Sequence, residues 1–282
     1  MRTGFENFSG KILLVVVLMS AANAADLVEY ADQANWEGDC LIGESQTPID
    51  IKPMKVKYCP DMGYYKFTLL CEEFMEQNEG NDFKITNAAG KAFAFFYDKK
   101  TNSYEAYEDV QLHWHTTSEH TIGGQSYDAE MHLFLVPAEV TDLPKEALGS
   151  YADFDFSEST NANMEAMVIG FLFKEDATAE TDIFSGTRED EELNVYWNLN
   201  NMFGCPMEKY FYMYHGSTTT PPCLENIKWF VSRVPLPLKT ESLAKINDKI
   251  VYETGESHRD IQDLNNRDVY LVGAPCMASE EL

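Results

Sequence analysis

Four of the six histidines in this chain lie within residues 113–132, and the spacing of the first two suits a metal site. His113 and His115 are two residues apart, so a strand over 110–117 would project both imidazoles from the same face of a sheet. Two imidazoles that leave one face side by side can bind the same ion. The stretch therefore predicts a strand that carries two metal ligands.

A tight turn places a third histidine beside them. Gly123-Gly124 predicts a two-residue β-hairpin, because glycine adopts the positive φ angles of such a turn without steric cost. Counting outward from the turn puts Ile122 opposite Gln125 and His115 directly opposite His132. Cross-strand partners share a face, and their Cβ atoms lie about 5 Å apart. Three imidazoles can then reach one tetrahedral Zn²⁺ ion, with the fourth position left for water.

A buried histidine that merely donates to a carbonyl is the more common interpretation of a single histidine in an apolar strand. Three histidines on one face of a hairpin argue against it, because they would repel one another on protonation. Zn²⁺ would use His113, His115 and His132 together. We therefore predict a zinc site made of these three residues.

The N-terminal residues have the pattern of a secretory leader. Lys11 precedes an apolar run, residues 12–19, that is too short to span a bilayer, and Ala22 and Ala24 form a small-residue cleavage site. We expect residues 1–24 to be a signal peptide and residues 25–282 to form one domain, because about 258 residues suffice for one substantial core. The protein should follow the secretory pathway to the exterior, with retention in a lumenal compartment as the alternative.

The chain is strongly acidic, with a net charge of −26 and a sequence pI near 4.4. Nucleic acid and anionic membranes are therefore unfavourable partners. A solvated acidic surface is the simplest interpretation, and attraction of calcium or a mineral face is the alternative. The densest acidic run, Glu189-Asp190-Glu191-Glu192, could also form the first turn of a helix, where the helix dipole favours carboxylates.

Six cysteines follow the predicted leader, namely Cys40, Cys59, Cys71, Cys205, Cys223 and Cys276. Secreted chains form disulfides, and six cysteines allow fifteen pairings. Because two cysteines never occur three residues apart in this sequence, a cysteine zinc site is disfavoured.

Short alternating segments bounded by turn residues favour a mostly β fold. We expect one domain with a large central, mainly antiparallel twisted sheet and short peripheral helices. The expected strands cover 64–70, 83–86, 92–97, 166–173, 210–214 and 228–234, and the expected helices cover 142–148, 189–202 and 239–250, the last with Thr240 as its cap.

Several motifs together resemble those of the α-class carbonic anhydrases. Residues 111–120 read Gln-Leu-His-Trp-His-Thr-Thr-Ser-Glu-His, residues 129–133 read Ala-Glu-Met-His-Leu, and residues 216–229 read Gly-Ser-Thr-Thr-Thr-Pro-Pro-Cys-Leu-Glu-Asn-Ile-Lys-Trp. The segments 46–51 and 265–267 also match, so the resemblance spans nearly the whole mature chain.

The resemblance implies a zinc lyase that reversibly hydrates CO₂ to bicarbonate and a proton through a zinc-bound hydroxide. His113, His115 and His132 would be the ligands. The short link between His115 and Glu119 is similar to the bacterial, plant and algal branch, since animal members carry a longer loop there.

Other residues are implied to orient the ligands. Gln111 and Glu130 share the ligand face with His113 and His132 at offsets of two, which suits acceptors of the second ring N–H. Asn265 belongs to the same matching set.

The segment around Thr219 resembles the gatekeeper of the family, although a Thr-Thr-Pro-Pro string alone is more often an ordinary turn. The threonine hydroxyl would accept from the zinc hydroxide and donate to a buried carboxylate, here Glu119. His120 resembles a structural histidine of the family. Cys40 and Cys223 stand where secreted members place a disulfide, which would hold the gatekeeper loop.

The resemblance also assigns the walls of a CO₂ pocket to Phe134, Val168, Thr218, Thr220 and Trp229. Phe134 stands where the family usually has valine, and Thr218 where it usually has leucine. We expect a narrower and more polar pocket, which would affect the rate more than metal binding.

Fast family members carry a proton-shuttle histidine in a region that corresponds to residues 87–91, where this chain has none. Exporting the proton would then depend on buffer. His215 and His258 match no motif, so we expect them at the surface.

The sequence favours a secreted carbonic anhydrase with CO₂ and bicarbonate as its small-molecule partners. The alternative is an acidic binding or matrix protein of the same fold, directed at calcium or a mineral surface, with weak or lost catalysis. A zinc peptidase is disfavoured because no His-Glu-x-x-His occurs.

Overall fold

The computed structural model describes residues 30–58, 65–71, 73–75, 84–86, 92–98, 103–137, 165–179, 188–189, 195–198, 210–250 and 257–272. The predicted signal peptide, the predicted helix over 142–148 and the region 87–91 lie outside them. In the described part of the chain, no helix is long and apolar enough to cross a membrane.

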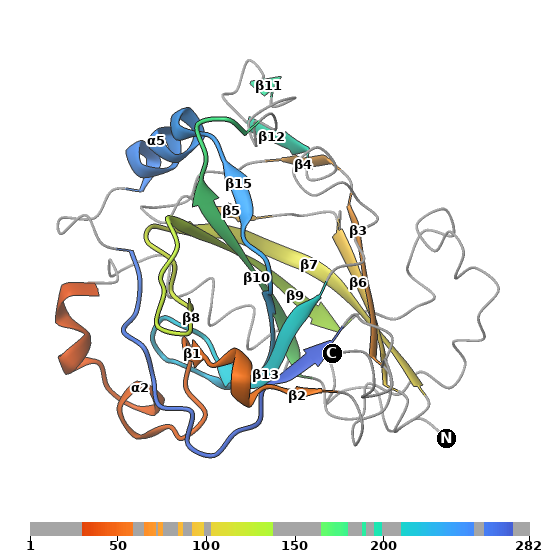
Figure 1. Cartoon of the computed structure of the whole chain (residues 1–282), viewed down its shortest axis with the longest axis vertical. Helices are drawn as coiled ribbons and strands as arrows, with labels where there is room; N and C mark the ends of the chain where they lie inside the picture. Colours follow the sequence, from red (N-terminus) through yellow and green to blue (C-terminus); the bar gives the residue numbers. More distant parts are fainter. Residues whose placement is uncertain are drawn as a thin grey trace, which may run out of the picture.

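The described elements are mainly strands, with few and short helices (Figure 1). The strands are β1 (Asp50–Ile51), β2 (Lys57–Tyr58), β3 (Tyr65–Cys71), β4 (Glu73–Met75), β5 (Lys84–Thr86), β6 (Ala92–Asp98), β7 (Ser103–His115), β8 (Thr121–Ile122), β9 (Ala129–Pro137), β10 (Ala166–Glu175), β11 (Arg188–Glu189), β12 (Val195–Asn198), β13 (Phe211–Ser217), β14 (Glu225–Ser232), β15 (Leu236–Leu238) and β16 (Tyr270–Val272). The helices are η1 (Tyr30–Asn35), α2 (Asp39–Ile42), η2 (Pro53–Lys55) and α5 (Thr240–Lys249).

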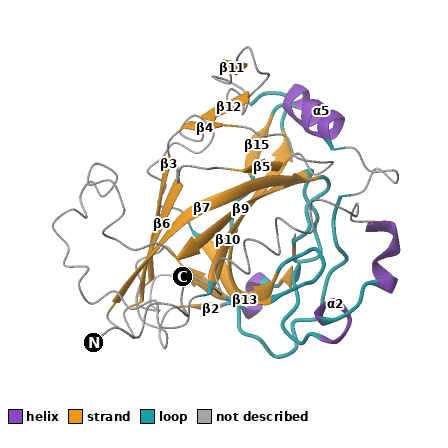
Figure 2. Ribbon diagram, turned by 180° about the vertical axis from the view of Figure 1, so that it is seen from behind, coloured by secondary structure: helices purple, strands orange, loops and turns teal. Residues whose placement is uncertain are grey.

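One large sheet dominates the fold, as the sequence predicted. Its strand order is β2-β16-β13-β14-β10-β9-β7-β6-β3, with β15 beside β10 and β5 beside β7. Most neighbours are antiparallel, whereas β10 runs parallel to β14 and β15, and β16 runs parallel to β2. The helices lie at the periphery of this sheet, which Figure 2 shows from behind.

Two sequence expectations about helices were wrong. Part of the predicted helix over 189–202 is the strand β12, which pairs with β4 and β11. Its Val-Tyr-Trp composition suits a strand, because β-branched and aromatic side chains pack well on a pleated surface. Thr240 does not cap α5. It is the first helical residue, and Lys239 precedes the helix without a side-chain capping bond.

The two faces of the sheet carry different clusters, because successive residues of a strand point to opposite sides. On β9, Met131 and Leu133 join one apolar cluster, whereas Phe134 and Val136 join the other. His132 lies on the second face, in step with Phe134. The histidines therefore project from the face that also carries an aromatic and aliphatic layer.

The hairpin that carries the three histidines differs from the predicted register. Ile122 bridges Gln125 across the Gly123-Gly124 turn, as predicted. Farther out, His132 lies opposite His113, and His115 lies opposite Glu130, so the pairing has slipped by two residues.

The slip arises between the turn and the long strands. Ser118 donates its N–H to the carbonyl of Tyr127, two residues away from the predicted pairing. Glu119 and His120 are the two additional residues on the first strand. They lie between Ser118 and β8 and do not pair with the second strand. An even slip keeps every side chain on its original face, so His113, His115 and His132 still converge.

Candidate metal centre

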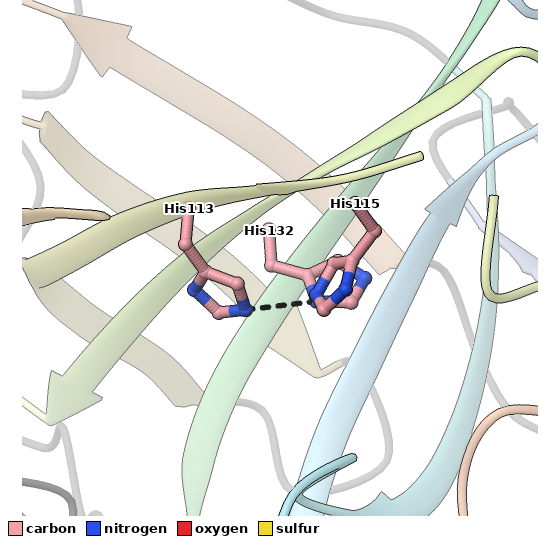
Figure 3. A group of neighbouring side chains, drawn as sticks. All are labelled: His113, His115 and His132. Atoms are coloured by element: carbon pink, nitrogen blue, oxygen red, sulfur yellow. Dashed lines mark hydrogen bonds between the residues drawn. The ribbon is translucent and has the colours of Figure 1, made fainter. Parts of the chain in front are cut away.

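Three ring nitrogens meet at the ends of β7 and β9. His115 Nε2 lies 3.1 Å from His132 Nδ1, and His132 Nδ1 lies 3.3 Å from His113 Nε2. Figure 3 shows the three imidazoles turned toward one another. His115 and His132 are buried, and His113 is partly exposed. The open side of the centre is therefore at His113.

The hydrogen bonds of the two buried rings fix where their protons lie. His115 Nδ1 contacts the carbonyl oxygen of Ser257, which can only accept, so Nδ1 carries the proton and Nε2 presents a lone pair. His132 Nε2 donates to Glu130 Oε1 at 2.9 Å, so its Nδ1 also presents a lone pair. Two lone pairs 3.1 Å apart cannot satisfy each other, and a cation between them resolves the conflict.

Burial keeps these imidazoles neutral. It lowers the pKa of His115 to about 4, despite the opposing effect of the Ser257 carbonyl. It also lowers the pKa of His132, with a further contribution from His115. Neutral imidazole is the form that binds a metal.

The donor set fits Zn²⁺. Zinc binds imidazole nitrogen at 2.0–2.1 Å, and tetrahedral angles then place ligand nitrogens about 3.3 Å apart. The nitrogens of His113, His115 and His132 all lie within 4.8 Å of one another, with the closest separations near that value. The three residues are thus placed to hold one ion.

The metal-free protein should be sensitive to acid because of His115. Its pKa is about 4 in the folded chain and about 6.5 when unfolded. The unfolded chain therefore takes up a proton first, and stability should fall as the pH drops from about 6.5 to about 4. The loss should be about 3 kcal/mol. Urea unfolding of the zinc-free protein across this range measures it, and a His115→Gln variant should lose the part of this dependence that His115 contributes.

Glu130 anchors His132 and His120 at once. Its Oε1 accepts from His132 Nε2 at 2.9 Å and from His120 Nδ1 at 2.7 Å, while Oε2 accepts the His120 N–H at 2.8 Å. Burial raises the pKa of Glu130, but electrostatic attraction to His120 and His132 and the hydrogen bonds from their rings outweigh it, so the pKa lies well below its ordinary value. Glu130 is therefore an ionised, fully buried acceptor.

His120 uses both of its ring nitrogens inside the protein. Its Nδ1 contacts Glu130, and its Nε2 lies 2.6 Å from the hydroxyl of Tyr214, which in turn donates to Thr47. Because both of its ring nitrogens are engaged within the protein, His120 supports this hydrogen-bond network, in agreement with its expected structural role.

Glu119 reaches the centre because of the slip in the hairpin. Its Oε2 lies 3.6 Å from His115 Nε2 and 3.8 Å from His132 Nδ1, and its Oε1 accepts the Arg259 N–H at 2.9 Å. Burial raises the pKa of this carboxyl. The nearby His132 imidazole and Thr219 side chain oppose the rise. Glu119, Thr219 and the ligand nitrogens thus form one buried group.

The loop that carries Thr219 is held at both ends. Cys40 and Cys223 form the disulfide that the family resemblance implied. Cys223 donates its N–H to the Thr220 carbonyl. Thr218 donates its N–H to the Leu224 carbonyl, and the Thr218 hydroxyl accepts the Leu224 N–H. The loop is therefore closed on itself beside the centre.

Thr218 does not make the pocket more polar in the way that we expected. Its hydroxyl donates to the Thr220 carbonyl at 3.1 Å and accepts the Leu224 N–H at 3.1 Å, so the loop uses both functions. A family leucine could make neither bond. The hydroxyl thus serves as an internal clasp of the gatekeeper loop.

Removing that clasp should loosen the loop. Thr218→Val keeps the shape, leaves the Leu224 N–H without its partner and removes one of the two hydrogen bonds to the Thr220 carbonyl, which should lower the free energy of unfolding by about 1–2 kcal/mol. Urea unfolding measures it. Thr218→Ser, which keeps the hydroxyl, is the matched control, and an equal loss in both variants would contradict the clasp.

Three of the expected pocket residues form a continuous wall across neighbouring strands. Phe134 on β9 pairs with Val168 on β10, which pairs with Trp229 on β14. All three are buried, and the Trp229 ring centroid lies 4.8 Å from that of His132. Thr220 is half-buried in the adjacent loop. An apolar wall therefore stands beside the ligands.

The expected positioning roles of Gln111 and Asn265 are not confirmed. The side chain of Gln111 lies outside the described part of the structure. Asn265 is exposed and donates to the carbonyl of Glu44, so its side chain is engaged with a neighbouring loop and not with a ligand. Ser257, which the sequence interpretation missed, orients His115 instead.

Arg259 is a second residue that sequence reasoning did not identify. Its guanidinium donates to the side-chain oxygen of Gln46 and to the carbonyls of Thr47 and Cys40, while its backbone N–H binds Glu119. It therefore ties the N-terminal arm, the disulfide and the buried carboxylate together. The match over 46–51 was the only sequence signal near it.

The N-terminal arm contributes an aromatic residue to the centre. Tyr30 is buried and stands edge-on to His115, with ring centroids 6.5 Å apart, and it also contacts Trp36.

Of the two unmatched histidines, His215 is exposed and lies 3.4 Å from Glu165, whereas His258 is only partly exposed. The prediction that both histidines lie at the surface is therefore confirmed for His215 alone.

Comparison with known proteins agrees with this geometry. The family model described as eukaryotic-type carbonic anhydrase matches residues 31–273. The chain belongs to this family. The family supports CO₂ hydration as the general activity, and its α-class members are zinc enzymes.

Curated carbonic anhydrases from several kingdoms are similar to the chain. Alpha carbonic anhydrase 8 of Arabidopsis thaliana is 27% identical over 239 residues, which cover 84% of this chain and 55% of that protein. A carbonic anhydrase of Nostoc is 27% identical over 81% of this chain and 76% of its own length. Carbonic anhydrase 6 of Bos taurus is 27% identical over 91% and 83%.

Solved carbonic anhydrases share the fold. Cah3 of Chlamydomonas reinhardtii, in complex with acetazolamide, superposes with a TM-score of 0.60 at 21% identity and covers 88% of this chain and 99% of that one. A hyperthermostable carbonic anhydrase from a hydrothermal vent chimney gives 0.56 at 25% identity, over 83% and 90%. The plant, bacterial and algal relatives agree with the branch that the short hairpin link suggested.

Proposed function

We propose that this carbonic anhydrase relative is an active zinc enzyme that reversibly hydrates CO₂ to bicarbonate and a proton. The observation that carries the proposal is the convergence of three histidine nitrogens, at 3.1 and 3.3 Å, beside the buried Glu119 carboxylate. His113, His115 and His132 would hold Zn²⁺, which supplies Lewis-acid activation of water at neutral pH.

The protein residues would orient the reactants. Glu119 Oε2 is buried without a hydrogen-bond partner among the described residues. It would take the Thr219 hydroxyl hydrogen and thereby leave only lone pairs on the Thr219 oxygen. That oxygen can accept a hydrogen bond from the attacking water species and so aim a lone pair of that species toward CO₂. Phe134, Val168 and Trp229 would offer CO₂ an apolar surface from which water is excluded.

A stopped-flow assay of CO₂ hydration on the purified chain, with zinc content measured on the same sample, tests the proposal. We expect about one zinc per chain and hydration well above the buffer rate. Stoichiometric zinc without hydration would refute the enzyme and favour the acidic binding protein. That alternative is motivated by the net charge of −26, but it gives no reason for three intact zinc-binding histidines.

Proton export should depend on external buffer. The region 87–91 offers no histidine to carry the proton from the site to solvent. Raising the concentration of an imidazole-type buffer should therefore increase kcat, with little effect on kcat/KM, because buffer takes the place of the missing group. A kcat that is independent of buffer concentration would mean that another residue of the chain exports the proton.

We also propose that residues 1–24 are removed as a signal peptide and that the mature domain works in an oxidising compartment. The Cys40–Cys223 disulfide supports this proposal, since such bonds persist mainly along the secretory route. N-terminal sequencing of the protein from a secreting host tests it. Cleavage after Ala24 is expected, and an intact leader on the mature protein would refute it.

A further inference from the structure

Gly170 stands in the middle of a mostly buried strand, between residues with large apolar side chains. It belongs to β10, and its neighbours Ile169 and Phe171 are buried. It lies directly opposite the ligand His132 on β9. Glycine weakens a strand, because it contributes no side chain to the packing. A glycine in such a place often marks the close approach of another group.

The group that approaches Gly170 is the Glu130 carboxylate. A Cβ atom at Gly170 would lie 2.7 Å from Glu130 Oε1, which is closer than carbon and oxygen normally approach. The same atom would lie 3.6 Å from Trp229 Cζ3, an ordinary contact distance. A methyl group would therefore displace the carboxylate and leave the tryptophan in place.

The carboxylate has no free direction in which to move. Glu130 is fully buried, and its two oxygens accept from His132 Nε2 at 2.9 Å, His120 Nδ1 at 2.7 Å and the His120 N–H at 2.8 Å. Any shift that clears the methyl group lengthens at least one of these bonds. The bond to His132 shares the oxygen that the methyl group would contact.

We propose that Gly170 is a positioning residue for the metal centre. Its missing side chain makes room for the carboxylate that keeps the proton of His132 on Nε2 and turns Nδ1 toward the ion. The inference rests on the proposed zinc site. Groups that orient a ligand histidine typically change metal affinity 10–100-fold when they are altered, so Gly170→Ala should weaken zinc binding by about that factor.

A double-mutant cycle separates this role from general damage to the sheet. The Kd for Zn²⁺ is measured by competition with a chromophoric chelator for the wild-type chain, Gly170→Ala, Glu130→Ala and the double variant. Gly170→Ala should weaken zinc binding about 10–100-fold in the chain that keeps Glu130. In the Glu130→Ala background it should weaken binding less than about twofold, because no carboxylate needs to move there. ¹⁵N NMR of the metal-free protein should show the Nε2–H form of His132 in the wild type and its loss in Gly170→Ala.

The outcomes are distinct. Unchanged zinc affinity in Gly170→Ala, or equal losses in both backgrounds, would overturn the positioning role and leave the proposed function standing. A wild-type chain that binds no zinc would overturn both. If Gly170→Ala fails to fold, recovery of the fold in the double variant supports the clash with Glu130, and failure of both variants overturns it.

Discussion

Replacing His132 by alanine should empty the metal centre. The residue supplies one of three ring nitrogens that lie within 3.3 Å of their nearest partner, and it is the one that contacts both others. Zinc sites contribute about 10–16 kcal/mol, so the loss of one ligand of three should cost at least about 3 kcal/mol, or more than about 100-fold in affinity. Zinc analysis after dialysis, together with competition by a chelator, measures the change.

His215→Ala is the matched control for this variant. It also removes one imidazole, but His215 is exposed and pairs with Glu165 away from the ligands. It should retain about one zinc per chain and the wild-type hydration rate. Full zinc occupancy in His132→Ala would mean that the three histidines do not form the site.

Thr219→Val should nearly abolish CO₂ hydration while zinc stays bound. Valine has the shape of threonine but cannot donate to Glu119 or accept from the attacking species, so the orientation of the nucleophile is lost. The loss of one well-placed hydrogen-bonding group in an active site lowers kcat by about 10²–10³-fold. Stopped-flow rates, normalised to zinc content, measure it.

Two further variants test the direction of the Thr219 bond. Thr219→Ser keeps the hydroxyl and should keep most of the activity. Glu119→Gln should lose about as much activity as Thr219→Val, because its carbonyl would take the Arg259 N–H and its amide would donate toward Thr219. Full activity in Glu119→Gln would show that the direction of this bond does not matter.

Several features of this protein follow from local pattern alone. The three histidines were predicted to share one face, although the register of the hairpin was wrong by two residues. The prediction survived because side chains alternate with a period of two, so any even slip preserves the face. The mainly antiparallel sheet could likewise be predicted, since alternating apolar segments and turn residues are local signals.

The error over 195–198 has the opposite cause. Leu193, Trp197 and Leu199 suggested a helix, but Val195–Asn198 is the central strand of a three-stranded sheet and pairs with β4, far earlier in the chain. Pairing with a distant strand outweighs a weak local preference, because each new ladder bond and side-chain contact adds to it.

The sequence by itself determined which histidines make up the proposed metal site and which face they occupy, because both depend on spacing within one hairpin. Only the tertiary structure decided what surrounds them. Ser257 and Arg259 lie about 140 residues away from the groups they bind, and no local pattern encodes such contacts. The two residues that leave the ladder, Glu119 and His120, also became visible only when both strands were paired, since a bulge is a property of the pair and not of either strand.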